Sequence, residues 1–329
     1  DVDLIVAPYQ GPAIEAPWWR AAANPAKLQG DLFRQGRETL RRVMPTRQPA
    51  TAEGAPVEES TVDRLLRSAA KTAVGPFWHR HLDRLLRDNP DAAGVLILTV
   101  PPNHLAGIPR DLMAKHGKPF LYYDGDAPAS LPRFSGFASG FRIYQGADIS
   151  EYTAVISNSK GSEEELSSLG AKAVHTLYYA VDPDLFSPMD VGRQDIDILF
   201  YGHGREYRSE WVDAMITEPS KRLSDARFAV RGTKLGDIGP TEQLPYLSLS
   251  ALREYACRSR INLAITRRAH ASVYGSSTAR PFELASMGAC IVANPYEGVE
   301  EWFEPEQEII VVDSADEAIE RYTWLLAHD

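Results

Sequence analysis

Residues 196–208 read IDILFYGHGREYR, and this stretch decides the fold expected for the chain. The apolar run from Ile196 to Tyr201 predicts a strand that is buried on both faces. Gly202 and Gly204 predict a tight turn directly after it, with a helix to follow. A strand, a glycine turn and a helix in this order are typical of a parallel α/β sheet.

The same alternation of strands and helices continues along the whole chain. Further apolar runs are expected to be strands, at 4–7, 95–100, 120–123, 154–157, 175–179, 228–231, 261–265, 291–293 and 309–312. Helices are expected between them, at 61–88 with an interruption at Gly75-Pro76, and at 110–116, 162–169, 210–216, 250–259, 281–287 and 314–327. The predicted fold class is therefore α/β, with two Rossmann-like, doubly wound parallel-sheet domains.

A domain boundary is expected within residues 181–193, which are rich in proline and glycine and precede a fresh strand. The boundary separates an N-terminal domain, 1–185, from a C-terminal domain, 190–313. The last segment, 314–329, opens with a capping-box pattern and predicts a helix that packs on either domain. Residues 44–60 carry many Pro, Ala, Thr and Glu residues, which predicts an exposed loop.

The composition excludes several classes of protein. With 329 residues, 44% of them hydrophobic, the chain is long enough for about two ordinary cores and is neither disordered nor collagen-like. A net charge of −10 argues against a general nucleic-acid or anionic-membrane binder, although a local pocket can still bind a small anion. Cys257 and Cys290 are too few for a disulfide framework. Neither a membrane span nor a signal peptide is recognisable, so a cytoplasmic protein is expected.

The glycine turn predicts a phosphate site. Backbone amides around Gly202 and His203 can approach an anion closely, and Arg205 and Arg208 add guanidinium groups suited to a diphosphate. Tyr207 replaces the third glycine of a dinucleotide-binding pattern, so that pattern is incomplete. The alternative is a tight turn with solvated arginines.

A second candidate anion site opens the helix expected at 281–287. The hydroxyls of Ser276, Ser277 and Thr278, the guanidinium of Arg280 and the free amides of the first turn form the predicted pocket. Glu283 lies on that first turn, where it can accept two hydrogen bonds from a vicinal diol such as ribose. The alternative is a carboxylate that only stabilises the helix dipole.

The chain resembles a known family over about residues 154–329. The resemblance rests on the segments 156–159, 169–170, 179–188, 280–283, 287–295, 300–303 and 308–310. They resemble the donor-binding half of GT-B glycosyltransferases, which have two Rossmann domains facing each other across a cleft. Within that fold the stretch is most similar to the spore-maturation, CgeB-like branch, which is related to glycosyltransferase family four (group 1).

The resemblance implies transfer of a sugar, of the hexosyltransferase type, from a nucleotide-diphosphate sugar to an unidentified sugar, protein or small-molecule acceptor. The donor would be a UDP- or GDP-sugar, with no cofactor or metal, and arginines and a helix N-terminus would stabilise the departing diphosphate. By position, Glu283 matches the glutamate that holds the ribose, and Arg208 the basic contact to the diphosphate. Lys234 follows the next strand and is expected near the base or the phosphates. Gly275 stands where family four has a second glutamate, beside the transferred sugar.

Acceptor-side residues are expected in the first domain. Asp124 and Asp126 end a strand as Asp-x-Asp, a spacing that can hold a divalent cation or place a carboxylate as a general base toward acceptor or sugar. His104 follows the preceding strand and is expected near the cleft. The adjacent Trp18 and Trp19 can stack on an acceptor sugar, and the alternative for them is a place in the core.

Three other functions stay open from the sequence. A nucleotide-sugar epimerase would use the same two-domain scaffold without an acceptor. A nicotinamide oxidoreductase built on Gly202 and Gly204 is disfavoured, because Arg231 stands where an acidic residue would hold the ribose. A non-catalytic protein that binds nucleotide sugars or a partner is favoured by Gly275.

Overall fold

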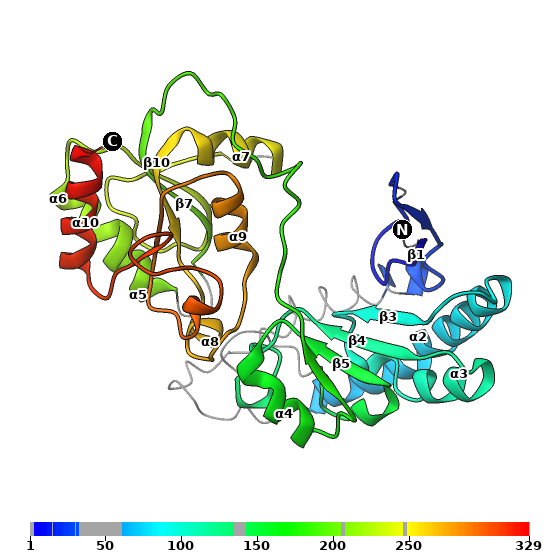
Figure 1. Cartoon of the computed structure of the whole chain (residues 1–329). Helices are drawn as coiled ribbons and strands as arrows, with labels where there is room; N and C mark the ends of the chain where they lie inside the picture. The colour runs from blue at the N-terminus through cyan, green and yellow to red at the C-terminus, as the bar shows by residue number, and fades with distance from the viewer. Residues whose placement is uncertain are drawn as a thin grey trace. The chain divides into compact units, whose positions relative to one another are not determined.

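The structure is a computed structural model that describes residues 3–14, 16–29, 31–32, 61–134, 143–204, 208–245 and 249–328. Its contacts divide the chain into two compact units (Figure 1). The first unit contains residues 1–125, 130–156 and 165–175, and the second contains 126–129, 157–164 and 176–329. The loop predicted at 44–60 and the candidate phosphate ligand Arg205 lie outside the described residues.

The first unit is built on a four-stranded sheet. Its strands lie in the order β3 (Val95–Leu98), β4 (Phe120–Asp124), β5 (Ala154–Ser157) and β6 (Val174–Thr176), and β3 and β4 are parallel. A separate parallel pair is formed by β1 (Leu4–Val6) and β2 (Trp19–Ala21). The helical elements are α2 (Thr61–Asp88), η1 (Pro102–His104), α3 (Ile108–His116), η2 (Pro132–Phe134), η3 (Ile149–Glu151), η4 (Lys160–Ser162) and α4 (Glu163–Ser168).

The interruption predicted inside the first long helix is wrong. The single helix α2 runs from Thr61 to Asp88 with Pro76 inside it. The Nε of Arg80 donates to the Pro76 carbonyl over 3.1 Å, one turn further on. Gly75 is buried, and a Cβ built there would lie 3.9 Å from the His104 carbonyl oxygen, so α2 packs against η1 next to the proline.

The second unit has a six-stranded sheet with the doubly wound strand order. The order is β12 (Ile310–Val311), β11 (Ile291–Ala293), β10 (Ser259–Ala264), β7 (Ile196–His203), β8 (Phe228–Thr233) and β9 (Glu242–Gln243), and every pair of neighbours is parallel. The chain starts at β7, winds outward to β9, and returns to β10 on the other side of β7. The carboxyl ends of β7 and β10 therefore form the switch point where sheets of this kind bind ligands.

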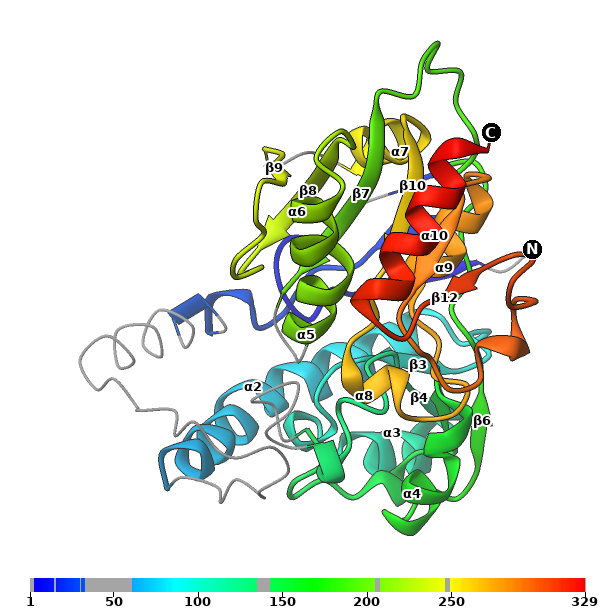
Figure 2. The ribbon, with the colours of Figure 1, turned by 90° about the vertical axis from the view of Figure 1, so that its left-hand side faces the viewer.

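Helices cover both faces of this second sheet (Figure 2). One core contains α5 (Ser209–Val212), the π-helical turn Asp213–Thr217 and α10 (Ala315–Ala327), with α6 (Glu218–Arg222) beside α10. The other core contains side chains of α7 (Leu249–Cys257) and α9 (Ala279–Ser286). The remaining short elements are α8 (Arg268–Ala271) and η6 (Val299–Glu301). The final helix packs on the second unit, where the Tyr322 hydroxyl donates to the Met215 carbonyl over 3.1 Å.

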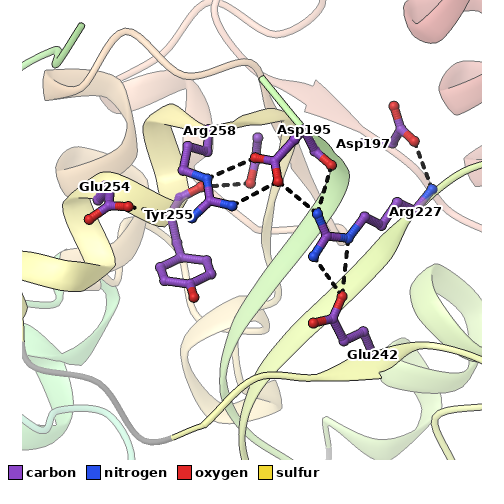
Figure 3. A network of polar contacts seen from close by, with 8 residues as sticks. Asp195, Asp197, Arg227, Glu242, Glu254, Tyr255 and Arg258 are labelled. Atoms are coloured by element: carbon purple, nitrogen blue, oxygen red, sulfur yellow. Dashed lines mark hydrogen bonds and ion pairs between the residues drawn. The ribbon is translucent and has the colours of Figure 1, made fainter. Parts of the chain in front are cut away.

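Charged residues tie together the amino ends of the central strands (Figure 3). Asp195 lies between two guanidinium groups, with its carboxylate oxygens 2.7 Å from Nε and Nη2 of Arg258 and 2.8 Å from Nη1 of Arg227. The three residues precede β7, β10 and β8 respectively. The Arg258 side chain is the first cause of the lowered pKa of Asp195. This network stabilises the edge of the sheet opposite the switch point.

The predicted α/β fold class with parallel sheets is confirmed. Within the described residues, no helix is both long and apolar enough to cross a bilayer.

Candidate functional site

Arg208 spans the switch point of the second unit. Its Nε donates to the carbonyl of Ile265, just past β10, over 3.0 Å, and its Nη1 donates to the carbonyl of His203, at the end of β7, over 3.1 Å. The guanidinium thus lies across the ends of the two strands between which the winding reverses. A fixed positive charge at this place is suited to an anionic ligand.

The glycine turn allows the ends of β7 and β8 to approach closely. Gly202 and Gly232 are partners in the ladder, and a Cβ on Gly232 would lie only 1.7 Å from the Gly202 carbonyl oxygen. A Cβ on Gly204 would lie 2.2 Å from the Lys234 carbonyl oxygen. These glycines are therefore required by the packing of the turn, whether or not it also receives a phosphate.

The two other candidate ligands of the turn are exposed. The Nδ1 of His203 lies 2.9 Å from the Thr233 hydroxyl. Lys234 has a positive φ of 58°, which turns the chain sharply after β8 and leaves its side chain in solvent.

Two guanidinium groups lie against the ring of Tyr201, beside the start of α9. The Arg280 guanidinium carbon is 3.4 Å from the ring centre, and that of Arg231 is 5.3 Å from it. Nη1 of Arg280 is also 2.9 Å from Oε2 of Glu283. Burial is the first cause of the lowered pKa of Arg280, while the Glu283 carboxylate acts in the opposite direction. Arg280, predicted for the second anion site, and Glu283, predicted as the ribose contact, therefore form one ion pair beside Tyr201.

The predicted hydroxyls before α9 are engaged within the protein. The Ser276 hydroxyl lies 2.6 Å from that of Ser159, and the Ser277 hydroxyl donates to the Asn158 carbonyl over 3.0 Å and accepts from the Tyr179 amide over 2.9 Å. Both serines are completely buried. Their side chains hold the segment 157–164 against the loop that leads into α9. Thr278 is half-buried and precedes the helix without a side-chain cap.

The backbone explains the glycine that departs from the family-four pattern. Gly275 has a φ of 57°, in the left-handed region that favours glycine. A Cβ there would lie 3.2 Å from the Cβ of Lys160 and 3.1 Å from the Tyr178 hydroxyl. A glutamate at this position would be both strained and crowded.

A further arginine at the end of β10 was missed by the sequence reasoning. Arg267 forms an ion pair with Asp126, and its Nε donates over 2.9 Å to Nδ1 of His270. His270 is only 1% exposed. Burial, followed by the positive charges of Arg267 and Arg208, lowers the pKa of His270, which keeps the imidazole neutral. Three consecutive polar residues after a buried strand, Thr266 to Arg268, were the available signal.

The candidates predicted for the acceptor side do not form one cluster. Asp124 is completely buried, and its Oδ2 accepts from Ser130 and Tyr144, both over 2.5 Å. Asp126 belongs to the second unit and pairs with Arg267, so the two aspartates point to different partners. No group of three or more possible metal-ligating side chains occurs in the part of the chain that the structure describes.

His104 and the tryptophans lie elsewhere in the first unit. The Nδ1 of His104 lies 2.8 Å from the Tyr9 hydroxyl, and burial lowers its pKa. Trp18 and Trp19 make an edge-to-face pair, in which Trp18 is 62% exposed. The Nε1 of Trp19 donates to the Ile14 carbonyl over 2.8 Å. The exposed ring of Trp18 is available for stacking.

The chain was compared with known families and structures. Residues 205–329 match a family described as "Glycosyl transferase-like". No curated protein matches the chain by sequence.

Solved structures resemble it over most of its length. The sucrose-phosphate synthase of Thermosynechococcus elongatus is 14% identical, with 84% of this chain and 73% of that chain covered at a TM-score of 0.55. Anabaena HepE in complex with UDP-glucose is 12% identical, with 74% and 71% covered and a TM-score of 0.51. An alpha-glucosyltransferase in complex with UDP and a DNA containing an HMU base is 13% identical, with 76% and 75% covered and a TM-score of 0.53.

These comparisons and the two parallel sheets agree on the architecture. The chain has the GT-B fold of the glycosyltransferases that it resembles, with one Rossmann-like unit in each half, and its C-terminal residues match a glycosyl transferase-like family.

Proposed function

We propose that the protein is a glycosyltransferase that takes a sugar from a nucleotide-diphosphate donor bound by its second unit. The observation that carries this proposal is the position of Arg208, whose guanidinium lies across the ends of β7 and β10 at the switch point. The similarity of residues 205–329 to a glycosyl transferase-like family supports it, since this segment includes Arg208 and all of α9.

The chemistry follows from the charge that develops on the leaving group. Breaking the glycosidic bond transfers negative charge to the nucleoside diphosphate, and a preorganised cation at that place stabilises the transition state more than the ground state. One such donor is typically worth about 3–4 kcal/mol. Arg208, the amides near Gly202 and His203, and Lys234 are the proposed diphosphate contacts. No step of this kind requires a metal ion.

Glu283 is the proposed contact to the donor ribose. It lies in the second turn of α9, three residues after Arg280, because the helix begins at Ala279 and not at 281 as predicted, and its side chain is 17% exposed. An ionised carboxylate there can accept hydrogen bonds from both hydroxyls of a vicinal diol. In this proposal Arg280 orients the carboxylate of Glu283, and the ring of Tyr201 packs against the guanidinium of Arg280.

The donor proposed is a UDP- or GDP-sugar with a hexosyl group. Anabaena HepE and the alpha-glucosyltransferase are named in complexes with UDP or UDP-glucose, which favours uridine. The assignment to the CgeB-like branch and the cytoplasmic location stay predictions from the sequence. The acceptor roles of Asp124, Asp126, His104, Trp18 and Trp19 also stay predictions.

The acceptor is proposed to be something other than nucleic acid. One structural relative is bound to DNA, but this chain carries a net charge of −10, which disfavours contact with a phosphate backbone.

A ligand screen by thermal stability tests the proposal. A ligand that binds only the folded protein raises its melting temperature according to its affinity, so UDP, GDP and their sugars should do so while nucleosides should not. Release of free diphosphate from a stabilising donor then separates a transferase from an epimerase, which isomerises the donor without releasing it. Stabilisation without any turnover across acceptors would favour the non-catalytic alternative. Absence of stabilisation by every nucleoside diphosphate would contradict the proposal.

A further inference from the structure

A second guanidinium lies at the switch point, and it already binds a carboxylate of the same unit. Arg267 follows β10, and its ion pair with Asp126 lies in the second unit, because residues 126–129 belong to that unit. The Arg267 side chain is 15% exposed and that of Asp126 is 35% exposed. Both side chains are therefore partly exposed to solvent.

Arg267 contacts a buried imidazole on which the charge of Arg208 also acts. His270 accepts from Nε of Arg267 over 2.9 Å, and the charges of both arginines act on it. Arg208 is itself fixed by the carbonyls of His203 and Ile265, and Ile265 is only two residues before Arg267. Two guanidinium groups are thus held near the carboxyl end of β10. Arg208 is held by backbone carbonyls, and Arg267 by the neutral His270 and the carboxylate of Asp126.

We propose that Arg267 is a second diphosphate contact of the donor site, and that Asp126 occupies its guanidinium until the donor displaces it. This inference rests on the proposed function. It adds Arg267 to the donor site and a competition between Asp126 and the donor diphosphate for its guanidinium. A carboxylate and a phosphate both present two oxygens to a guanidinium, so one can replace the other on the same pair of N–H donors. The competition lowers the apparent affinity for the donor by the fraction of molecules in which Arg267 is free of Asp126.

The competition predicts opposite effects for the two partners of the ion pair. Arg267→Ala should weaken UDP binding about tenfold, as the loss of a charge-assisted contact does. Asp126→Asn should strengthen UDP binding several-fold, because the neutral amide competes poorly for the guanidinium. The double variant should bind UDP as Arg267→Ala alone does, since Asp126 acts only through Arg267.

Titration calorimetry with UDP, GDP and inorganic pyrophosphate on the full chain measures these effects. Arg222 and Asp316 supply matched controls, because they form an exposed ion pair of 2.7 Å at α6 and α10. Arg222→Ala and Asp316→Asn should leave UDP binding unchanged. Asp126→Asn should also show a larger UDP-induced rise in melting temperature than the unaltered protein, a gain that the loss of a purely structural ion pair would not produce.

The outcomes separate this inference from the proposed function. If Arg208→Ala weakens UDP binding while Arg267→Ala behaves like Arg222→Ala, Arg267 is no contact and only the inference is overturned. If a folded Asp126→Asn protein binds UDP no more tightly than the unaltered protein, the competition is overturned. If the unaltered protein binds neither nucleoside diphosphate nor pyrophosphate, the proposed function itself fails.

Discussion

The guanidinium of Arg280 stacks on the ring of Tyr201, 3.4 Å from its centre, and reaches from there to the carboxylate of Glu283. The tyrosine comes from β7 and the arginine from α9, so the stack joins the central strand to the helix that carries the proposed ribose contact. An aromatic face supports a buried guanidinium without taking its hydrogen-bond donors. The ion pair with Glu283 therefore lies beside the ring, with Nη1 of Arg280 2.9 Å from Oε2 of Glu283.

Replacing Tyr201 tests that support. Tyr201→Leu should lower the free energy of unfolding by about 1–2 kcal/mol more than Tyr201→Phe, because only the leucine variant loses the aromatic face. Urea unfolding of the two variants measures the difference. UDP affinity should fall in the leucine variant and stay near that of the unaltered protein in the phenylalanine variant. Equal stability of the two variants would show that the stack contributes nothing.

Glu283→Gln separates a ribose contact from a carboxylate that only favours the helix dipole. The amide should weaken UDP binding about tenfold or more, since hydrogen bonds to a charged group contribute about 1.5–3 kcal/mol. Pyrophosphate, which has no ribose, should bind as before. Glu317 lies in the first turn of α10 and provides the control, because Glu317→Gln removes a carboxylate from a helix outside the proposed donor site. An equal loss for UDP and pyrophosphate would contradict the ribose assignment.

The network around Asp195 should make stability depend on pH. The neighbouring arginines lower the pKa of Asp195, so its ion pairs stabilise the folded state above the ordinary carboxyl pKa of about 4 and lose that effect as the pH falls below it. Asp195→Asn should therefore lower the free energy of unfolding at pH 7, by about 1–2 kcal/mol for a half-buried bidentate pair, and by less near pH 3, where the carboxyl group of the unfolded chain is mostly protonated. Urea unfolding at the two pH values checks this. Asp316→Asn, at an exposed pair, should change little at either pH.

A side chain at Gly275 would meet two costs, the strain of a left-handed backbone and crowding against neighbouring atoms, and a comparison with Gly288 separates them. Gly275→Ala should destabilise the protein by more than the roughly 1–2 kcal/mol expected for a left-handed alanine, because its Cβ also meets Lys160. Gly288 has a similar φ of 68° but no neighbour of a built Cβ closer than 3.8 Å, so Gly288→Ala measures the strain alone. Thermal unfolding of both variants gives the difference. A Gly275→Ala protein as stable as Gly288→Ala would show that the loop yields without cost.

The apolar runs were sufficient to predict most of the fold. Strands predicted at 154–157 and 291–293 match β5 and β11 in full, and the run at 196–201 is the central strand β7. Parallel strands buried on both faces leave such uninterrupted apolar runs, and local sequence is enough to recognise them. The short polar strands β2 and β9 were missed, because their pairing depends on a neighbour and not on their own composition.

The sequence by itself determined the alternation of strands and helices, the glycine turn after β7 and the candidates Arg208 and Glu283, since each depends on residues close together in the chain. Only the tertiary structure decided which side chains meet. Tyr201 and Arg231 are ladder partners thirty residues apart in the sequence. Arg267 forms an ion pair with Asp126, 141 positions earlier. The hydroxyls of Ser276 and Ser277 form hydrogen bonds to the segment 157–164. Such contacts follow from strand order and register, which no local pattern encodes, because they depend on the free energy of packing the whole sheet.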